Sequence, residues 1–317
     1  MTKRAFIFPG QGAQSVGMGK ALAGAFPAAA AVFHEVDDAL GEKLSSLIWN
    51  GPEDALTLTA NTQPALMAVS VAAMRALEAE FGIGVDAADF VAGHSLGEYS
   101  ALCAAGAIDL AETARLLRTR GNAMQAAVAP GEGAMAALLG ADTEQAEAAC
   151  AAGVADAGGI CEIANDNAPG QLVLSGSAAA IEAACGHARD NGVKKAVPLA
   201  VSAPFHCSLM APAAEAMREA LSDAAIKPPK VPLIANVTAA VTTDPETIRD
   251  QLVAQVTGRV RWRETVEFMA ANGIAGTAEA GAGKVLTVMN RRTEKEIKGV
   301  TLGTPENLQA FADLVAG

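Results

Sequence analysis

The most informative part of this sequence is Asp89-Phe90-Val91-Ala92-Gly93-His94-Ser95-Leu96-Gly97-Glu98-Tyr99. The apolar run over 89–92 predicts a strand and residues 98–105 predict a helix, so a Gly-x-Ser-x-Gly turn joins the two. This arrangement is typical of a nucleophile elbow, in which the turn is too tight for side chains beside the serine. The elbow would lift Ser95 to a helix N-terminus, where backbone N–H groups favour a developing oxyanion. We therefore predict a catalytic serine rather than a chance serine in a glycine-rich turn.

Outward from the elbow, the order of predicted elements indicates an α/β core. A strand over Ala5–Phe8 leads into a glycine-rich loop, and helical stretches follow near residues 17–40 and 64–81. Asn61 or Thr62 can cap the second stretch, and Pro64 suits its first turn. Strands that alternate with helices predict a mostly parallel sheet, so we expect a hydrolase-like α/β fold.

Residues 131–201 follow a different pattern. The predicted elements run strand, helix, strand, strand, helix, strand, over residues 134–139, 142–152, 160–164, 171–175, 178–191 and 193–201. A turn is predicted at 165–170. The order β-α-β-β-α-β is that of the ferredoxin-like split unit. We therefore predict a small ferredoxin-like subdomain at 131–201, inserted into a core made of residues 1–130 and 202–317.

Composition limits the kinds of partner and the cellular compartments that we expect for this protein. The chain has 317 residues and a net charge of −12, which argues against a nucleic acid partner because phosphate binding needs a basic face. No apolar run reaches the length of about 18 residues expected of a membrane-spanning helix. Five cysteines without Cys-x-x-Cys spacing favour reduced thiols in the cytoplasm and show no zinc pattern. We expect a cytoplasmic protein without a bound metal.

A serine nucleophile needs a base, and the chain has four histidines. Two of them, His34 and His187, lie within predicted helices. His94 precedes the nucleophile, so its side chain should point away from that of Ser95. His206 follows a strand, in a loop that a proline projects. By elimination we predict that His206 is the base, the alternative being a structural histidine.

The chain lacks an obvious acid to complete a serine hydrolase triad, in which the acid lies between serine and histidine. Most of that interval is the predicted insert, and the aspartates within it are Asp142, Asp156, Asp166 and Asp190. These lie away from the ends of the core strands. We therefore predict that a carbonyl orients His206, fixing its tautomer but stabilising the imidazolium less than a carboxylate would.

An oxyanion hole needs two N–H donors at the same end of the sheet. The amide of Leu96 follows the nucleophile and is one candidate. The loop Pro9-Gly10-Gln11-Gly12-Ala13-Gln14 follows the first strand, and its glycines let the backbone of Gln11 approach a ligand. This loop does not match a dinucleotide motif, because Ser15 stands where Gly-x-Gly-x-x-Gly requires glycine. Residues 278–285 likewise do not match a phosphate loop.

Arg120 is a cation on an apolar stripe. Leu116 and Met124 lie four residues to either side of it on the predicted helix 111–128, so the three side chains share one face. A buried guanidinium needs a partner for its charge. The partner is either an internal carboxylate, which makes Arg120 structural, or a substrate carboxylate gripped by both nitrogens of the fork. The pattern alone favours neither.

Taken in order, the motifs resemble those of the malonyl-CoA–acyl carrier protein transacylases of dissociated fatty-acid synthesis. The matching stretches are Phe8-Pro9-Gly10-Gln11-Gly12, Asn61-Thr62-Gln63-Pro64, 93–101, Arg120-Gly121, 165–171, Pro204-Phe205-His206 and 283–286. They cover nearly the whole chain. The resemblance implies a hydrolase-like core with a ferredoxin-like insert and no tightly bound cofactor. It also implies a ping-pong reaction that carries malonyl from coenzyme A, through a malonyl-serine, to the phosphopantetheine thiol of acyl carrier protein.

The resemblance also implies a role for each site residue. Arg120 would hold the malonyl carboxylate, and the backbone at Gln11 and Leu96 would form the oxyanion hole. A carbonyl at Gln255 would orient the histidine base, and Asn167 would line the pocket from the small subdomain. Phe205, before the histidine, mildly supports malonyl over methylmalonyl.

Two basic doublets, Lys194-Lys195 and Arg291-Arg292, are candidates for docking the carrier. Carrier proteins of the resembled pathway are acidic, so an acidic enzyme needs local positive patches to bind them. The alternative is a solvated surface. We expect a monomer.

Three other functions stay open at this level. A serine hydrolase or thioesterase would release its acyl group to water, but Arg120 and the missing acid speak against it. An acyltransferase of a polyketide pathway is closer and differs in its carrier. A non-catalytic docking subunit is disfavoured because Ser95, His206 and both glycine loops are intact.

Overall fold

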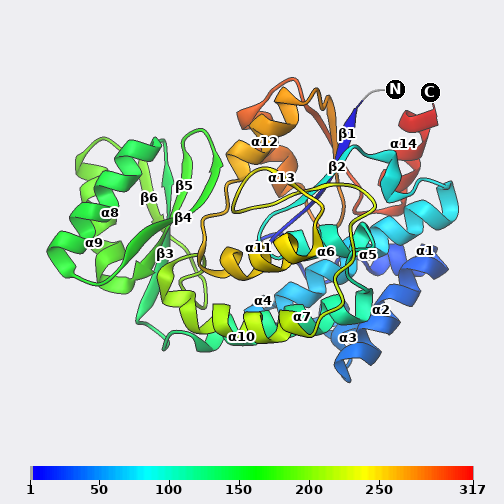
Figure 1. Cartoon of the computed structure of the whole chain (residues 1–317), viewed down its shortest axis with the longest axis horizontal. Helices are drawn as coiled ribbons and strands as arrows, with labels where there is room; N and C mark the ends of the chain where they lie inside the picture. Colours follow the sequence, from blue (N-terminus) through cyan, green and yellow to red (C-terminus); the bar gives the residue numbers. More distant parts are fainter. Residues whose placement is uncertain (1–2, 317) are drawn as a thin grey trace.

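The computed structural model describes residues 3–316. Figure 1 shows a larger body built around one sheet and, beside it, a smaller sheet with two helices. The elements run in the order β1 (Arg4–Phe8), α1 (Lys20–Ala25), α2 (Pro27–Leu40), α3 (Leu44–Asn50), α4 (Glu53–Thr57), α5 (Thr59–Phe81), η1 (Val85–Ala87), β2 (Phe90–Gly93), α6 (Gly97–Ala104), α7 (Leu110–Ala126), β3 (Gly133–Leu139), α8 (Thr143–Ala157), β4 (Cys161–Ala168), β5 (Gln171–Ser177), α9 (Ala178–Asp190), β6 (Lys195–Pro198), η2 (Ser208–Met210), α10 (Ala211–Ser222), β7 (Leu233–Ile234), β8 (Val241–Thr242), α11 (Pro245–Thr257), α12 (Trp262–Ala271), β9 (Gly276–Glu279), α13 (Val285–Thr293), β10 (Lys298–Thr301) and α14 (Pro305–Ala316).

The larger sheet has the strand order β10-β9-β1-β2-β7-β8, and its pairs are parallel except for β7 with β8. Side chains of β1 alternate between two apolar clusters: Phe6 and Phe8 face one, Ala5 and Ile7 the other. Helices α2, α5, α6 and α7 cover the first face, while α12 and α13 cover the second (Figure 1). A parallel sheet covered on both faces explains why β1 is apolar throughout. The predicted α/β core is confirmed.

The smaller sheet has the order β4-β5-β3-β6, with every pair antiparallel. Helices α8 and α9 share an apolar cluster with it. Asp142 begins α8 with a capping box. The Asp142 carboxylate accepts from the Gln145 backbone N–H, and the Gln145 side-chain oxygen accepts from the Asp142 backbone N–H. The element order and this strand order make the unit ferredoxin-like, as predicted.

The start of α5 differs from the prediction. The helix begins at Thr59, so Pro64 lies inside it rather than in its first turn. Asn61 and Thr62 do not cap it, because their side chains donate backward to carbonyls at the C-terminal end of α4. A proline in a helix leaves the carbonyl four residues earlier without its usual donor. Here that carbonyl, of Ala60, accepts from Arg118 Nη1 at 2.7 Å, which compensates for the missing bond.

The turn predicted at 165–170 is mostly strand, since β4 continues to Ala168. Two of its buried polar side chains have partners: Asp166 forms a bidentate ion pair with Arg263, at 2.8 Å, and Asn167 bonds His94. The backbone of β4 also contacts the core, because Val260 donates to the Ala164 carbonyl and the Asp166 N–H donates to the Val260 carbonyl. Strand β6 is shorter than predicted, and the stretch near 17–40 is two helices divided before Pro27.

None of the helices within residues 3–316 is long and apolar enough to cross a membrane. The five cysteines are buried and unbridged. In the same described part of the chain, no cluster of three or more His, Cys, Asp or Glu side chains is placed to hold a metal ion.

Candidate active site

The nucleophile elbow lies between β2 and α6, at the edge where the parallel strands end. Ser95 has a φ of 53°, a left-handed conformation that costs a non-glycine residue free energy and marks functional turns. A Cβ added to Gly93 would lie 1.9 Å from Gly97 backbone atoms, and one on Gly97 would lie 2.2 Å from the Phe8 carbonyl. The two glycines are therefore needed for close backbone approach, as the motif predicts.

Asn236 holds this strained turn. It follows β7, whose carboxyl end lies beside that of β2. Its Oδ1 accepts from the Ser95 N–H at 2.7 Å, and its Nδ2 donates to the Gly93 carbonyl at 2.5 Å. One buried amide thus bridges both sides of the nucleophile and supports the left-handed residue between them.

His206 lies against the nucleophile with its Nε2 2.7 Å from Ser95 Oγ. Its Nδ1 faces two carbonyl oxygens, of Gln255 at 2.9 Å and of Gly258 at 3.1 Å. Carbonyls only accept, so Nδ1 carries the hydrogen and Nε2 is left free to accept the serine proton. The orienting groups are carbonyls, and Asp166, the buried aspartate of the insert, pairs with Arg263 instead.

The surroundings of His206 keep it neutral. Burial, followed by the positive charge of Arg120, lowers its pKa to about 3, against the carbonyl hydrogen bonds, which raise it. The imidazole can therefore accept a proton at neutral pH. The carbonyls belong to the C-terminal end of α11, whose dipole is negative there. That end stabilises an imidazolium that forms during reaction, in place of a carboxylate.

The small subdomain helps to hold this histidine. His206 has a φ of 57°, a second left-handed residue at the site. Glu162 of β4 accepts from both the N–H (3.0 Å) and the hydroxyl (2.5 Å) of Ser208, two residues further on. The pairing of Val260 with Ala164 fixes the segment just after the Gly258 carbonyl.

Arg120 reaches the same point from α7 and is fully buried, at 1% exposure. Its Nη1 donates to Gln63 Oε1 at 2.8 Å, and its Nη2 donates to Gln255 Oε1 at 2.8 Å and to Ser95 Oγ at 3.2 Å. Within residues 3–316 it forms no ion pair, so the internal carboxylate partner allowed by the sequence is not in direct contact. A buried cation thus faces the nucleophile with neutral partners.

The two residues predicted to donate to the oxyanion, Gln11 and Leu96, line the same cavity as Ser95. The loop after β1 lines the cavity at Gln11, whose side chain bonds Thr59 Oγ1 at 3.3 Å and so fixes the loop. Leu96 leads into α6, where the helix N-terminus favours negative charge. Among residues 3–316 neither the Gln11 N–H nor the Leu96 N–H is engaged in a hydrogen bond. Both amides are free to donate to a ligand.

These groups open into one cavity of about 330 Å³. Ser95, His206 and Arg120 lie on its wall with apolar side chains around them. The apolar lining comprises Leu96, Met124, Met135, Leu199, Ala200, Val201 and Phe205. A short polar acyl group fits the charged end, while the apolar walls keep water away from the serine.

Asn167 lies behind this cavity rather than in its lining. Its Oδ1 accepts from His94 Nε2 at 2.8 Å, and the His94 ring also lies against Trp262, with ring centroids 5.8 Å apart. The lining residue from this strand is Asn165. Asn167 therefore supports the wall through His94.

The two basic doublets lie on the surface. Lys194 and Lys195 precede and begin β6, and both are exposed. Arg292, in the last turn of α13, donates to Gln171 Oε1 at 2.8 Å. Gly170, before that glutamine, bonds Gly140, over which the stem of Lys194 lies. Lys194 and Arg292 therefore flank the same end of the small sheet.

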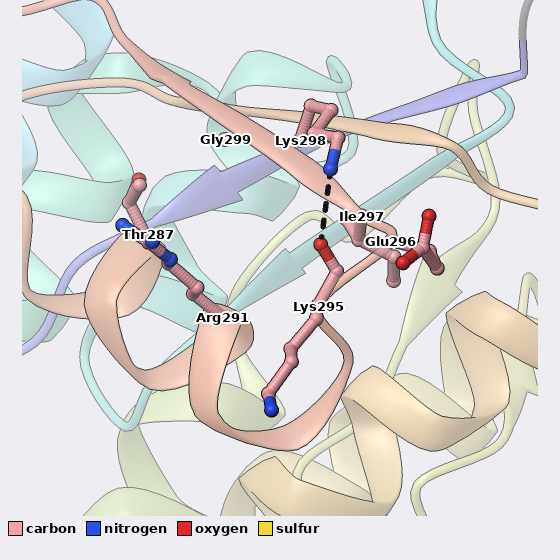
Figure 2. Close-up of a pocket in the computed structure, with 7 residues that line it drawn as sticks. All are labelled: Thr287, Arg291, Lys295, Glu296, Ile297, Lys298 and Gly299. Atoms are coloured by element: carbon pink, nitrogen blue, oxygen red, sulfur yellow. Dashed lines mark hydrogen bonds between the residues drawn. The ribbon is translucent and has the colours of Figure 1, made fainter.

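Arg291 points elsewhere. Figure 2 shows it extending past Thr287 at a separate surface cavity of about 700 Å³. Lys295 and Lys298 line this cavity too, and Lys298 Nζ donates to the Lys295 carbonyl at 3.2 Å. The arginine doublet is thus split between two surface hollows.

Sequence reasoning missed three buried polar side chains that contact the site residues. Asn236 follows a core strand that ends at the same edge as β2, and this position is the signal that could have found it. Gln63 lies in the Asn61-Thr62-Gln63-Pro64 motif, but its contact with Arg120 of α7 is visible only in the folded chain. Glu98 follows the elbow and is buried at 1% exposure, although a glutamate in a helix ordinarily faces solvent.

Comparisons with known proteins agree with this geometry. The acyl transferase domain family matches residues 5–306. A malonyl CoA-acyl carrier protein transacylase of Bacillus subtilis is 45% identical, over 98% of this chain and 96% of the relative. The structure of an acyl-carrier-protein-S-malonyltransferase from Bartonella henselae superposes with a TM-score of 0.96 at 57% identity, covering 99% of this chain and 100% of that one.

A further structure shows a relative with its partner. It contains a malonyl-transacylase in complex with its type II PKS acyl-carrier protein and matches with a TM-score of 0.95 at 40% identity. It covers 99% of this chain and 100% of that one. At these identities and coverages, likeness of fold and sequence together establish kinship. The chain therefore belongs to the acyl transferase family, and within it to the malonyl CoA-acyl carrier protein transacylases.

Proposed function

We propose that this protein transfers the malonyl group of malonyl-CoA to the phosphopantetheine thiol of an acyl carrier protein, through a malonyl ester on Ser95. The observation that carries this is the buried Arg120 cation, 3.2 Å from the nucleophile and without an ion-pair partner among the described residues. A malonyl carboxylate supplies the missing partner. A simple hydrolase or acetyl transferase has no use for such a cation.

The first half-reaction uses Ser95 and His206. As Ser95 Oγ attacks the thioester carbon, its proton moves to His206 Nε2. The oxyanion that forms accepts hydrogen bonds from the Gln11 and Leu96 N–H groups. When the intermediate collapses, the C–S bond breaks and the imidazolium returns its proton to the sulfur of coenzyme A. Malonyl-serine remains, with its carboxylate held by Arg120.

The second half-reaction runs the same steps with another thiol. The phosphopantetheine thiol gives its proton to His206 Nε2 as its sulfur attacks the ester carbon. The Ser95 Oγ–C bond then breaks and Oγ regains the proton. Water competes poorly because the acyl group lies among the apolar walls of the cavity.

Mass analysis of the acyl-enzyme tests this proposal. After incubation with malonyl-CoA and digestion, the malonyl mass should lie on the peptide that contains Ser95, because this hydroxyl faces the base. Ser95→Ala should abolish the label, while Ser222→Ala, an exposed serine at the end of α10, should keep it. Label on a cysteine such as Cys207 would contradict the serine mechanism.

Carrier docking is proposed at the two basic doublets. Reversing both to glutamate should raise KM for the carrier and leave KM for malonyl-CoA nearly unchanged, because an acidic carrier loses its positive contacts. Exposed Val285 and Val288, which lie beside Arg292, add apolar contact area. Steady-state transfer with each substrate varied in turn provides the measurement.

Single reversals sharpen this test, because the doublets do not share one hollow. Arg292→Glu and Lys194→Glu change the end of the small sheet, whereas Arg291→Glu changes the cavity of Figure 2. Lys3→Glu, at an exposed lysine just before β1, serves as the matched control. If KM for malonyl-CoA rises as much as KM for the carrier, the patches bind the phosphates of coenzyme A instead.

The carrier protein that accepts the malonyl group determines the biosynthetic pathway in which the enzyme acts. We propose a role in fatty-acid synthesis, with a cytoplasmic monomer as the working form. Transfer to a fatty-acid carrier should be faster than transfer to a polyketide carrier in paired assays. The reverse preference would place the enzyme with the type II PKS relative. Light scattering in solution tests the monomer.

A further inference from the structure

A buried carboxyl group that the proposed mechanism does not use lies one side chain away from Arg120. Glu98, in the first turn of α6, accepts from the Asn236 N–H at 3.1 Å and from Gln255 Nε2 at 2.7 Å. The oxygen of the same Gln255 amide accepts from Arg120 Nη2 at 2.8 Å. Its Nε2 also donates to the Ser95 carbonyl, at 3.1 Å. The Gln255 amide therefore bridges the buried cation and the buried carboxyl group.

Glu98, together with the Ser95 carbonyl, determines which way that amide points. An ionised carboxylate only accepts hydrogen bonds, so it requires the NH₂ end of Gln255. A guanidinium only donates, so Arg120 requires the oxygen end. An ionised Glu98 and a cationic Arg120 thus fix one amide orientation, and the backbone of this same residue orients His206.

The charges at the site change when a carboxylated acyl group enters. Arg120 then pairs directly with the malonyl carboxylate and indirectly, through the amide, with Glu98. Two carboxyl groups that share one buried cation repel each other, and the pKa of one of them rises. The malonyl carboxylate is held by the fork itself, so the more distant Glu98 is the group that becomes protonated.

The other titratable groups nearby do not provide a second cation. Burial raises the pKa of Tyr99, which follows Glu98 on α6, so its phenol stays neutral. His206 faces the site from the loop before α10 and is neutral, because burial and Arg120 lower its pKa to about 3. Within residues 3–316, Arg120 is the charged group that acts on Glu98. Burial raises the pKa of Glu98 to about 7, against hydrogen bonds and the Arg120 charge, which lower it.

We propose, resting on the malonyl transfer proposed above, that Glu98 is a proton-linked positioning residue. Its carboxylate holds Gln255 against Arg120 before malonyl binds, and it takes up a proton from solvent when the malonyl carboxylate pairs with Arg120. Malonyl binding is then favoured by low pH and weakens as the pH rises above that at which Glu98 ionises. Acetyl-CoA, which brings no carboxylate, binds without this linkage.

Calorimetric titration in buffers of different ionisation enthalpy measures the protons taken up. The Ser95→Ala chain allows binding without transfer, and the difference between malonyl-CoA and acetyl-CoA removes the contribution of the coenzyme phosphates. The expected difference is about half a proton at pH 7, approaching about one at pH 8, because Glu98 is more fully ionised there before binding. Adding Glu98→Gln, which keeps the side-chain shape, should bring the difference near zero.

Each outcome separates the two proposals. If malonyl-CoA binds no tighter than acetyl-CoA, Arg120 does not select malonyl and the proposed function fails together with this inference. If malonyl-CoA binds tighter but the proton uptake persists in Glu98→Gln, the proton lies elsewhere and only the role of Glu98 is overturned. Should Glu98→Gln not fold, the infrared carbonyl band of a protonated carboxylic acid, appearing in Ser95→Ala with malonyl-CoA alone, decides the question. Its absence contradicts the proposal.

Discussion

Replacing His206 with alanine should slow acylation of Ser95 by about a thousandfold or more, as loss of the base does for other serine nucleophiles. The variant removes the nitrogen that lies 2.7 Å from Ser95 Oγ and leaves the elbow, Arg120 and the oxyanion donors in place. The rate of coenzyme A release in a single turnover, with enzyme in excess over malonyl-CoA, measures this step apart from carrier binding.

Matched variants identify what orients the base. His187→Ala removes a surface histidine that pairs with Asp156, and the rate should stay within about a few-fold. Replacing each aspartate between Ser95 and His206 by asparagine should do the same, because carbonyls of α11 and Gly258 face the imidazole. The melting temperature of Asp166→Asn must also be measured, because this variant breaks the ion pair with Arg263 and can destabilise the fold. If replacing one of these aspartates slows acylation as much as replacing His206, that aspartate completes an ordinary catalytic triad and the hydrolase alternative is favoured.

The core and the elbow could be predicted because local rules and the fold agree there. Ala5 to Phe8 is apolar on both faces, as a central parallel strand must be, and Gly93 and Gly97 allow an approach that no side chain permits. Ser95 and His206 follow from motif and elimination. The elbow is recognised from residues that lie close together in the sequence, and the base is recognised because the chain has only four histidines.

The parts that could not be predicted depend on contacts across the sequence. Residues 165–167 are polar residues that favour turns, yet they form strand because Asp166 pairs with Arg263, almost a hundred positions later. Pro64 is tolerated inside α5 only because Arg118 reaches back to the freed carbonyl. The Gln255 amide that links Arg120 to Glu98 belongs to a helix with no motif of its own. Such pairings become visible only in the folded chain.

Replacing Arg120 with alanine should lower malonyl transfer by about 30- to 1000-fold. Charge-assisted bidentate bonds to a buried carboxylate contribute about 2–4 kcal/mol, and this arginine is buried at 1% exposure, where water screens the pair little. Acetyl transfer should fall much less or rise, because the variant removes an unpaired cation. Arg120→Lys keeps the charge without the fork and should recover only part of the malonyl rate. Transfer from each CoA thioester under kcat/KM conditions measures the ratio.

Arg115→Ala is the matched control for this ratio. It lies on the same helix but is exposed and pairs with Glu112, so its loss should leave both transfer rates near their starting values. The folded state must be checked as well, since Arg120 donates to Gln63 and Gln255 and its removal leaves both amide oxygens buried without that partner. A melting temperature that falls while the malonyl-to-acetyl ratio changes still supports selection by charge. Equal losses of malonyl and acetyl transfer would instead show that Arg120 has a structural role, which is to hold the Gln63 and Gln255 side chains.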